Sequence, residues 1–575
     1  MLRWTPSTDD LDAPSAIEYE LYRNGNFFQL TPPGTSAIGI YTQPGTQTWT
    51  VVAVDRVREG RLGVLSSPAD AVAAAPAAMR DTYERMALEL LALVKHDCPV
   101  CDQVLPALDA AGVRILSQSS ENDTAAQAAR LSLSRVPEID LDLAVSERLD
   151  PVAVPAVFLL DGDAERDRVE GLARDRLAHL LARAGRPASL EGLPEMRPGC
   201  LSRTRDPDVA PRLAARRARA EGRIVSRELE IGTLEDPLEA LHDRGLTDGL
   251  PVVPPTPERV VETLEHTSRH PQDLVGVVPP YGGRATVEKV AINAVLAGCA
   301  GPELPIVLAA VAAACREDFA LQGVVATTAP PGPVVVVSGP YAGRAGMNAG
   351  GNALGQGNRA NSTIGRALQL TVRNVGGGRP GREDRAAHGQ PGKVGTAFAE
   401  RLDETAPWPG LAHARAPLGP DETGVTLFAG EAPRFVVDQL ARDPDALAVT
   451  LAAELEHVGS RRARLIHDAL LVVGPEHGRV FRQAGWSRER LQDELHRRTH
   501  RRAGDLVRGA DGIADGLPAG TVADPDAPVP KFAAPERILL AYAGGDAGLF
   551  SMIIGGWASG EMGSTPVTGS IEPWR

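Results

Sequence analysis

Residues 95–108 read KHDCPVCDQVLPAL, and this stretch decides the fold of the chain around it. The apolar run LELLALV (88–94) comes directly before it and is typical of a buried strand. Cys98 and Cys101 follow with two residues between them, and Pro99 suits the first turn of a helix. The sequence therefore predicts a strand, a cysteine pair and a helix in immediate succession, with the first cysteine at the N-terminus of the helix.

The position of the cysteine pair favours redox chemistry. Unpaired N–H groups and the helix dipole stabilise a thiolate at Cys98, and Cys101, one turn into the helix, can resolve a mixed disulfide. A zinc site would need a second cysteine pair or a histidine pair, and none follows at a suitable spacing. Haem attachment would need histidine where Asp102 stands. Zinc stays the minor alternative.

The predicted elements that follow continue in a recognisable order. VRILS reads as a strand, DTAAQAARLSLSRV as a helix and VAVPAVFLLDGD (152–163) as a strand, before a final short strand and helix. Strand–helix–strand followed by strand–strand–helix is similar to thioredoxin family proteins, and the resemblance covers about residues 80–185. It implies that Cys98 is the nucleophile, that Cys101 is the resolving thiol and that Pro155 is a cis proline that faces the dithiol and contacts the substrate backbone.

Residues 1–75 look like short strands. IEYELYRNG (17–25) alternates apolar and polar residues and turns at Asn24-Gly25, which is a strong hairpin signal. TWTVVAVD (48–55) is a second alternating run. This region resembles a fibronectin type III domain, which implies a β-sandwich and the role of a spacer or docking module.

Cys200 lies in a Pro-Gly turn, LPEMRPGCLSRTRDP (193–207), beside Arg197, Arg203 and Arg205. Nearby positive charge lowers the pKa of a thiol and raises its reactivity. We therefore expect Cys200 to be a redox partner, which the dithiol reduces or with which it exchanges a sulfur-bound group. A passive thiol in a linker is the alternative.

The remainder of the chain resembles a bacterial set of thioredoxin-fused proteins. In them an RPGC turn precedes a segment like TDGLPVVPPTPERV (247–260), and the last region resembles the domain named after a U-G-S-C motif. Here the string is Cys-Leu-Ser-Arg, so the second motif cysteine is absent. We divide the chain into a thioredoxin-like domain (76–186), a linker with the Cys200 motif (187–240) and a UGSC-like domain (241–575).

The last domain reads as an α/β fold with a mostly parallel sheet. Three apolar strands each run into a glycine turn, and a strand that feeds such a turn places backbone N–H groups around a ligand. The three stretches are PVVVVSGPYAGRAG (333–346), ALLVVGPEHGRVF (469–481) and RILLAYAGGDAGLF (537–550).

The densest polar patch of this domain is residues 346–378, where amide and guanidinium side chains stand among glycines. A helix capped by Asn361 or Ser362 is predicted inside it. Donors that converge on a helix N-terminus favour an anion or oxyanion site, and a tight packing turn is the alternative. The predicted substrate-binding residues are Asn348, Asn352, Asn358, Arg359, Asn361, Arg366, Asp248, Arg284, Asp546 and Ser551.

The bulk composition excludes several classes of protein. The net charge of −14 argues against a general nucleic-acid binder, and no stretch approaches the roughly 18 apolar residues of a membrane span. Five cysteines in 575 residues are too few for a secreted disulfide scaffold, and the start, MLRWTPSTDD, lacks the features of a signal peptide. With the abundance of Arg, Ala, Gly and Pro, these features indicate a cytoplasmic bacterial protein without nucleic-acid or membrane partners.

We predict a multidomain thiol-disulfide redox enzyme. Its dithiol serves Cys200, and its α/β domain binds a small substrate, anionic or sulfur-containing. One alternative is a non-redox lyase or hydrolase with the thioredoxin-like domain as an accessory, and another is a protein that handles soft metals or organometals through its thiols. No cofactor and no resident metal are predicted. An external thiol reductant is expected as a partner, and assembly into a homo-oligomer is left open.

Overall fold

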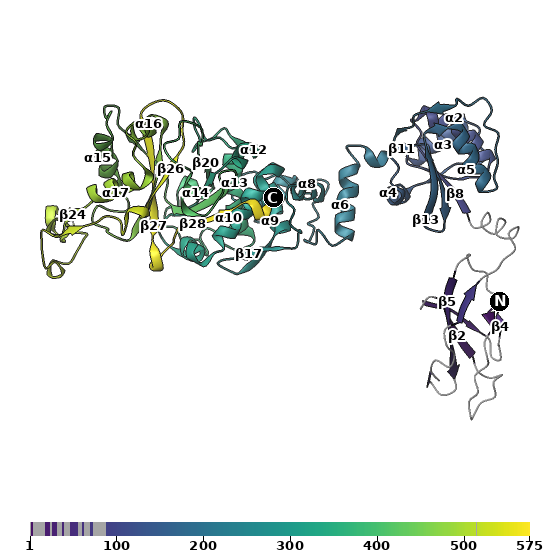
Figure 1. The fold of residues 1–575 in the computed structure, drawn as a ribbon, viewed down its shortest axis with the longest axis horizontal. Coiled ribbons are helices and arrows are strands. Elements are labelled where there is room, and N and C mark those ends of the chain that lie inside the picture. Colours follow the sequence, from purple (N-terminus) through teal and green to yellow (C-terminus); the bar gives the residue numbers. More distant parts are fainter. Residues whose placement is uncertain are drawn as a thin grey trace. The chain divides into compact units, whose positions relative to one another are not determined.

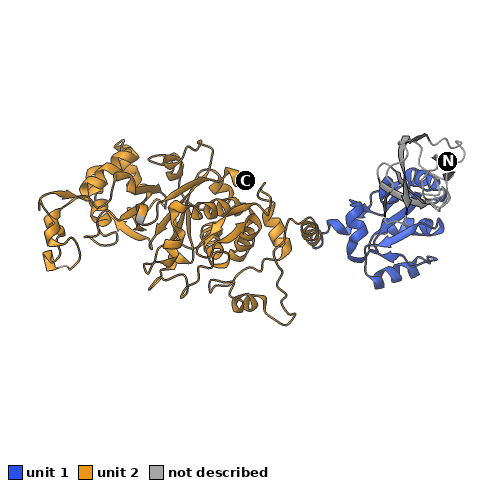
Figure 2. Ribbon diagram, turned by 90° about the horizontal axis from the view of Figure 1, so that it is seen from below, with its two compact units in different colours: residues 1–209 blue, residues 210–575 orange. Residues whose placement is uncertain are grey.

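The structure is a computed structural model. It describes residues 88–575, except Ile513 and the side chain of Met562. Of the residues before 88, it describes only the strands. The chain divides into two compact units, residues 1–209 and residues 210–575 (Figure 2). Each unit has apolar cores of its own, made only of its own residues. The two units are therefore treated separately.

The strands before residue 88 pair in antiparallel fashion. β2 pairs with β3 and with β5, while β6 and β7 both pair with β5. β1 pairs with β4. The predicted turn at Asn24-Gly25 lies outside the described residues, although the strands on either side of it meet at Arg23 and Asn26. The strands are β1 (Leu2–Arg3), β2 (Glu18–Arg23), β3 (Asn26–Thr31), β4 (Ala37–Ile38), β5 (Thr46–Asp55), β6 (Gly60–Arg61) and β7 (Ala69–Val72).

The part of the first unit after residue 87 is built around one mixed sheet, in the order β10-β9-β8-β12-β13 (Figure 1). β10, β9 and β8 run parallel, and β12 and β13 are antiparallel to their neighbours. The elements are β8 (Leu88–Val94), α2 (Pro99–Ala110), β9 (Arg114–Ser117), α3 (Glu121–Arg130), β10 (Glu138–Ile139), α4 (Ala144–Leu149), β11 (Ala153–Val154), β12 (Ala156–Asp161), β13 (Ala164–Glu170), β14 (Leu172–Ala173), α5 (Arg174–Arg183), β15 (Met196–Arg197) and β16 (Cys200–Leu201). The predicted element order is confirmed.

The apolar runs of the sequence explain why this sheet forms. Residues 90–94 of β8 and residues 156–160 of β12 are buried throughout, as expected for central strands covered on both faces. The apolar face of α2, with Val104, Leu105 and Leu108, packs into the same core. This packing fixes the start of α2, and with it the cysteine pair, at the end of β8.

The segment predicted as a linker, residues 187–240, is divided between the two units. Leu190 is buried in the core of the first unit, and Cys200 packs against that core. From residue 210 on, the chain contributes Ala215, Ala218 and Ile224 to a core of the second unit. The Cys200 motif is therefore part of the same compact unit as the dithiol.

The second unit contains an eight-stranded sheet, and the prediction of a mostly parallel sheet is wrong. Only β19–β20 and β23–β26 are parallel among its described pairs, because β21 and β27 lie between them and run antiparallel to their neighbours. β22 and β28 also pair in antiparallel fashion, with β27 and β21. The strands are β19 (Gly332–Ser338), β20 (Thr396–Ala399), β21 (Gly424–Gly430), β22 (Arg434–Val437), β23 (His467–Val473), β26 (Ile538–Tyr542), β27 (Phe550–Ala558) and β28 (Val567–Ser570).

The strand direction was predicted wrongly because these strands are buried on both faces of the sheet. Every residue of β19 and of β21 is buried, so both strands read as continuous apolar runs, the pattern usual in parallel sheets. Burial on both faces produces such a run whatever the strand direction. The three predicted strands that end in glycine turns are nevertheless present as β19, β23 and β26.

Helices cover both halves of this sheet. α9, α10 and α13 pack with β19 and β21 in one core, and α15 and α17 pack with β23 and β26 in another (Figure 1). Two small two-stranded sheets stand apart from it, β17 (Leu274–Val278) with β18 (Gly283–Thr286) and β24 (Arg501–Arg502) with β25 (Pro528–Val529). The helices are α6 (Ala210–Ala220), α7 (Pro237–Asp243), α8 (Pro257–Leu264), α9 (Val287–Ala297), α10 (Leu304–Ala314), α11 (Leu321–Ala326), α12 (Tyr341–Arg344), α13 (Arg359–Asn374), α14 (Leu411–Arg415), α15 (Pro444–Leu455), α16 (Pro475–Gln483) and α17 (Arg488–Arg498).

Candidate functional site

The cysteine pair begins helix α2, as the sequence predicts. Cys98 is the N-cap of the helix, and its Sγ accepts a hydrogen bond from the backbone N–H of Cys101 at 3.3 Å. Pro99 occupies the first turn, where a missing N–H costs nothing. The side chains of Cys98 and Cys101 are 1% and 0% exposed. The pair is thus a buried dithiol at a helix N-terminus.

The Val154-Pro155 peptide lies beside this dithiol and is cis, as the thioredoxin resemblance implies. The Cys98 Sγ lies 3.4 Å from the carbonyl oxygen of Val154. The carbonyl of Pro155 accepts a hydrogen bond of 2.8 Å from the N–H of Gly171. The backbone on either side of the cis bond is therefore fixed, with the Val154 carbonyl against the Cys98 sulfur.

Cys200 joins the two cysteines of the helix. Strands β11 and β16 pair in antiparallel register, which sets Cys200 opposite Val154, whose carbonyl contacts Cys98. Hydrogen bonding from Cys200 to the Cys98 sulfur is one of the causes that lower the pKa of Cys98. Three sulfur atoms therefore meet at the end of β8, and Cys200 alone among them is partly exposed.

These contacts shift the pKa values of the three thiols in different directions. The hydrogen bond with the Cys101 side chain lowers the pKa of Cys98 to about 5, because this bond, with further ones from Cys200, outweighs the effect of burial. Burial raises the pKa of Cys101 well above its ordinary value, and the neighbouring Cys98 raises it further. Cys98 is therefore the thiolate of the cluster at neutral pH.

The prediction that arginines lower the pKa of Cys200 is wrong. Burial, followed by the hydrogen bond and the charge of Cys98, raises this pKa to about 11. The arginines act elsewhere, since Arg203 hydrogen-bonds the carbonyl of Gln118 and Arg205 pairs with Asp150 at 2.7 Å. Cys200 therefore donates a hydrogen bond to the Cys98 thiolate.

Residues 195–205, here called the strap, hold Cys200 in place. β15 pairs with β14, and β16 pairs with β11. Between them Gly199 passes so close to the body of the unit that a Cβ there would lie 2.7 Å from the Val154 oxygen and 3.1 Å from Cα of Gly171. Only glycine fits this approach. The Gly199 of the RPGC turn is therefore required by packing.

The far end of the strap is anchored by a buried polar network. The side-chain amide of Gln118 donates hydrogen bonds of 2.9 Å to Ser146 and to Ser202, and its oxygen accepts one of 2.9 Å from the N–H of Arg203. Sequence reasoning missed Gln118, because a single glutamine after a strand carries no signal of this role.

In the second unit, the asparagine side chains of residues 346–361, here called the Asn-rich loop, form hydrogen bonds within that loop. The Asn361 side chain accepts from the N–H of Asn348 and donates to the carbonyls of Asn348 and Ala353, at 2.8 to 3.0 Å. Asn358, rather than Asn361 or Ser362, caps α13 by accepting from the Asn361 N–H at 2.9 Å. Asn352 bonds the carbonyl of Gln356. These contacts show a tightly packed loop.

Two other predicted binding residues pair with each other. Arg366 and Asp248 form a two-point ion pair with N–O distances of 2.7 and 2.8 Å, which lowers the pKa of the Asp248 carboxyl although burial opposes it. Arg359 donates to the carbonyl of Gly298 at 2.7 Å. Arg284 lies elsewhere, because Gly283 beside it abuts Val375 at the far end of α13, about 24 Å along the helix from its N-cap.

The C-terminal glycine loop, residues 543–549, lies beside the Asn-rich loop. The N–H of Gly544 donates to the carbonyl of Ala349 at 2.9 Å, and Gly545 lies against Gly351. Asp546 pairs with Arg401 at 2.9 Å. Ser551 is buried, and its hydroxyl lies 2.8 Å from Nδ1 of His477. The two loops and the Arg401–Asp546 pair form one cluster. Ser551 is not part of it, because its side chain is buried against His477.

A buried carboxylate that sequence reasoning missed lies at the same edge of the sheet. Glu400 directly follows β20 and accepts hydrogen bonds from the Ser338 hydroxyl at 2.5 Å, from the Leu411 N–H at 2.6 Å and from the Tyr542 N–H at 3.2 Å. Burial raises its pKa, while these bonds and the charge of Arg488 oppose the rise. Glu400 thus joins the ends of β19, β20 and β26, and the acidic residue after the apolar run TAFA was the available signal.

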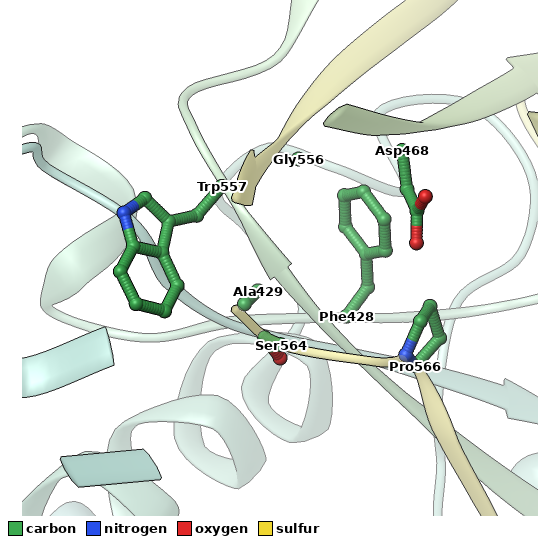
Figure 3. A pocket seen from close by; sticks show the side chains of 7 residues that line it. All are labelled: Phe428, Ala429, Asp468, Gly556, Trp557, Ser564 and Pro566. Carbon is green, nitrogen blue, oxygen red and sulfur yellow. The ribbon is translucent and has the colours of Figure 1, made fainter. Parts of the chain in front are cut away.

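A small hollow near the other end of β27 is not a substrate site. It is lined by Phe428, Ala429, Asp468, Gly556, Trp557, Ser564 and Pro566 (Figure 3). The space is too narrow to hold a water molecule. In the described part of the chain no three or more His, Cys, Asp and Glu side chains are grouped as a metal site, and no helix there has the length and apolar character needed to cross a membrane.

Comparison with known proteins gives a limited result. No protein-family model matches the chain, and no curated protein matches it. Among solved structures, a secreted disulfide oxidoreductase of Mycobacterium tuberculosis, described as homologous to E. coli DsbE, is similar to this chain at 15% identity, with a TM-score of 0.15. The match covers 20% of this chain and 89% of that one. The match is thus confined to a small part of the chain.

Proposed function

We propose that the chain is a thiol-disulfide oxidoreductase in which the thioredoxin-like Cys98/Cys101 dithiol serves Cys200. The observation that carries this proposal is the Cys98 sulfur itself, which accepts a hydrogen bond from the Cys101 N–H at the start of a helix and lies against Val154, the residue paired with Cys200. A sulfur held in this way stays ionised at neutral pH, and the thiolate is the reactive form in disulfide exchange.

The shifted pKa values support distinct roles for Cys98 and Cys101. The Cys98 thiolate attacks a disulfide and forms a mixed disulfide, in which its negative charge is gone. Because that charge and the hydrogen bond to Cys98 both raise the pKa of Cys101, the pKa of Cys101 falls at this step. Cys101 can then lose its proton and displace the bound partner, which leaves a Cys98–Cys101 disulfide.

Thiol trapping tests the proposal directly. Mild oxidation of the full-length protein, alkylation of the remaining thiols and peptide mass spectrometry should find Cys98 linked to Cys101. Cys299 and Cys315, which are remote in sequence and belong to the second unit, should be recovered as alkylated thiols. Recovery of Cys98 and Cys101 as free thiols under conditions that oxidise ordinary dithiols would refute the proposal.

For the second unit we propose a UGSC-like domain that binds a small anionic or sulfur-containing substrate. Support comes from the side-by-side placement of the Asn-rich loop and the C-terminal glycine loop, next to Arg401, whose guanidinium pairs with Asp403 and Asp546. Arg401→Ala in this cluster should weaken substrate binding, and Arg284→Ala, at the far end of α13, serves as the matched control.

For the remaining parts we propose a fibronectin type III-like docking module at residues 1–75 and a reducing, cytoplasmic location. The antiparallel strand pairs before residue 88 support the first proposal. The low cysteine count supports the second. An external thiol reductant would then keep the dithiol reduced.

A further inference from the structure

The three thiols of the first unit differ in their access to solvent. Cys98 and Cys101 are 1% and 0% exposed, whereas Cys200 is partly exposed. Cys200 is paired in register with Val154, whose carbonyl oxygen lies 3.4 Å from the Cys98 sulfur. A reagent that approaches from solvent therefore meets Cys200 before it meets the dithiol.

The strap also fills the backbone edges beside the dithiol. An exposed strand edge next to a reactive group is a ready partner for an extended polypeptide, which would add itself as a further strand. Here β11 is already paired with Cys200–Leu201, and β14 is paired with Met196–Arg197. The N–H of Ser202 extends this pairing by donating to the carbonyl of Val152 at 3.0 Å.

The fit of the strap is tight as well as continuous. At Gly199 and Gly171 the two backbones approach so closely that a Cβ on either residue would lie under 3 Å from the atoms opposite. Beyond Cys200, the strap is held by Ser202 and Arg203 through the buried Gln118 side chain. A polypeptide could reach the edges of β11 and β14 only if this whole segment were displaced.

We propose that the dithiol exchanges electrons with low-molecular-weight thiols and disulfides by way of Cys200, while the strap excludes polypeptide disulfides. This inference rests on the proposed function and adds to it the class of exchange partner and the route. Cys200 is then a catalytic residue of the exchange, and the strap determines specificity.

The reduction of the oxidised dithiol by a small thiol, RSH, balances as follows. The Cys200 thiolate attacks Cys98 Sγ, so that a Cys98–Cys200 bond forms and the Cys98–Cys101 bond breaks, and Cys101 leaves and takes up a proton. RS⁻ then attacks Cys200 Sγ and expels Cys98 as a thiolate. A second RS⁻ attacks the Cys200–SR disulfide and releases RSSR, and Cys200 regains a proton. Two RSH are oxidised to RSSR, and one protein disulfide is reduced to two thiols.

The structure favours the second step of this route, in which RS⁻ attacks Cys200 and expels Cys98. In a disulfide exchange the better leaving group is the thiol with the lower pKa, and hydrogen bonding from Cys101 lowers the pKa of Cys98 to about 5. Attack at the partly exposed sulfur of Cys200 therefore expels the stabilised thiolate of Cys98. In the oxidised dithiol Cys98 has lost its charge, so one cause of the raised pKa of Cys200 is removed.

The test uses the full-length protein, oxidised so that it holds the Cys98–Cys101 disulfide, with glutathione as the small thiol. Samples quenched with N-ethylmaleimide over time are mapped by mass spectrometry. We expect glutathione to be found on Cys200, and we expect Cys200→Ser to be reduced at least ~10-fold more slowly, because the exposed sulfur is lost. Cys315→Ser, in the second unit, is the matched control and should be reduced at the wild-type rate.

A second arm tests the exclusion of polypeptides. The reduced wild-type protein should leave the disulfides of insulin intact, whereas Gly199→Ala, whose Cβ displaces the strap, should reduce them. Glutathione found on Cys98, equal reduction rates for wild type and Cys200→Ser, or rapid insulin reduction by the wild type would each overturn the inference. The proposed function fails separately, if the starting protein never forms the Cys98–Cys101 disulfide.

Discussion

Single residues decide the chemistry of the first unit, and the decisive one is Cys98. Its sulfur accepts a hydrogen bond from the Cys101 N–H at 3.3 Å, and hydrogen bonding from the Cys101 side chain and from Cys200 lowers its pKa. Burial alone would disfavour the thiolate, so these hydrogen bonds account for the lowered pKa. The reactivity of the site is therefore a property of three neighbouring residues, and each can be removed in turn.

The first prediction concerns ionisation of this sulfur. Thiolate absorbance near 240 nm should rise with a midpoint near pH 5 in the reduced protein, as the lowered pKa of Cys98 requires. Cys98→Ser should abolish this low-pH step, and Cys200→Ala should move it upward, because one stabilising hydrogen bond is lost. A wild-type titration without any step below pH 7 would contradict the account.

Sequence reasoning reached part of this site at the level of residues. Cys98, Cys101 and Pro155 followed from their spacing and from the thioredoxin resemblance, and the structure brings them together. The pKa of Cys200 was mispredicted, since neighbours in sequence, such as Arg203 and Arg205, point to other partners. The charged groups that surround a thiol are set by the folded chain. Their distance along the sequence does not predict them.

Among the elements, the strap is the one that the sequence could not reveal. Its strands, β15 and β16, are two residues each and lie in a stretch rich in Pro, Gly and Arg. Such a stretch reads as a linker. Only the tertiary structure shows that its backbone pairs with β14 and β11.

The second prediction tests the close backbone contact between Gly199 of the strap and Gly171 of the first unit. Gly171 has a φ of +72°, and a Cβ there would lie 2.7 Å from the Gly199 nitrogen. Gly171→Ala should cost roughly 1 kcal/mol or more through the left-handed backbone alone, should loosen the strap and should raise the pKa of Cys98. Gly162→Ala, also at positive φ but in open space, is the control, and it should leave the thiolate titration unchanged.

The third prediction concerns the start of α13 in the second unit. Asn358→Ala should lower the stability of this unit by about 1 kcal/mol, because the N-cap hydrogen bond to the Asn361 N–H is lost. Ser362→Ala, exposed and one turn later, should be nearly neutral. A chemical denaturation series that ranks the two variants the other way would show that the cap is misassigned.

The sheet of the second unit shows where pattern reasoning stops. Strands β19, β23 and β26 and their glycine turns were predicted from apolar runs, and the neighbouring strands were not. β27 reads FSMIIGGWA, a glycine-rich run that carries little strand signal. Because this strand and β21 are antiparallel to their neighbours, the direction of most pairs was predicted wrongly.

For the whole molecule, the main feature is that the two units have separate apolar cores. The core around the dithiol contains only residues of the first unit, and the other cores contain only residues of the second. Changes at the cysteines should therefore act on the stability of one unit.

The fourth prediction uses pH to test this separation. Because the pKa of Cys98 is lowered from 9.0 to about 5, its ionisation contributes stability that is complete above pH 9 and is lost as pH falls toward 5. In calorimetry of the reduced protein, Cys98→Ser should lower the midpoint temperature of one unfolding transition more at pH 8 than at pH 5. The other transition should not move, and a shift of both would contradict the separation of cores.

The contact between Cys98 and Cys200 is the central claim, and disulfide mapping of oxidised Cys101→Ser tests it most directly. With its resolving thiol removed, Cys98 is predicted to form a disulfide with Cys200 in the folded monomer, detectable as a linked peptide pair in mass spectrometry. Cys98 recovered as a free thiol, or linked only to a second molecule, would contradict the placement of Cys200 against the nucleophile.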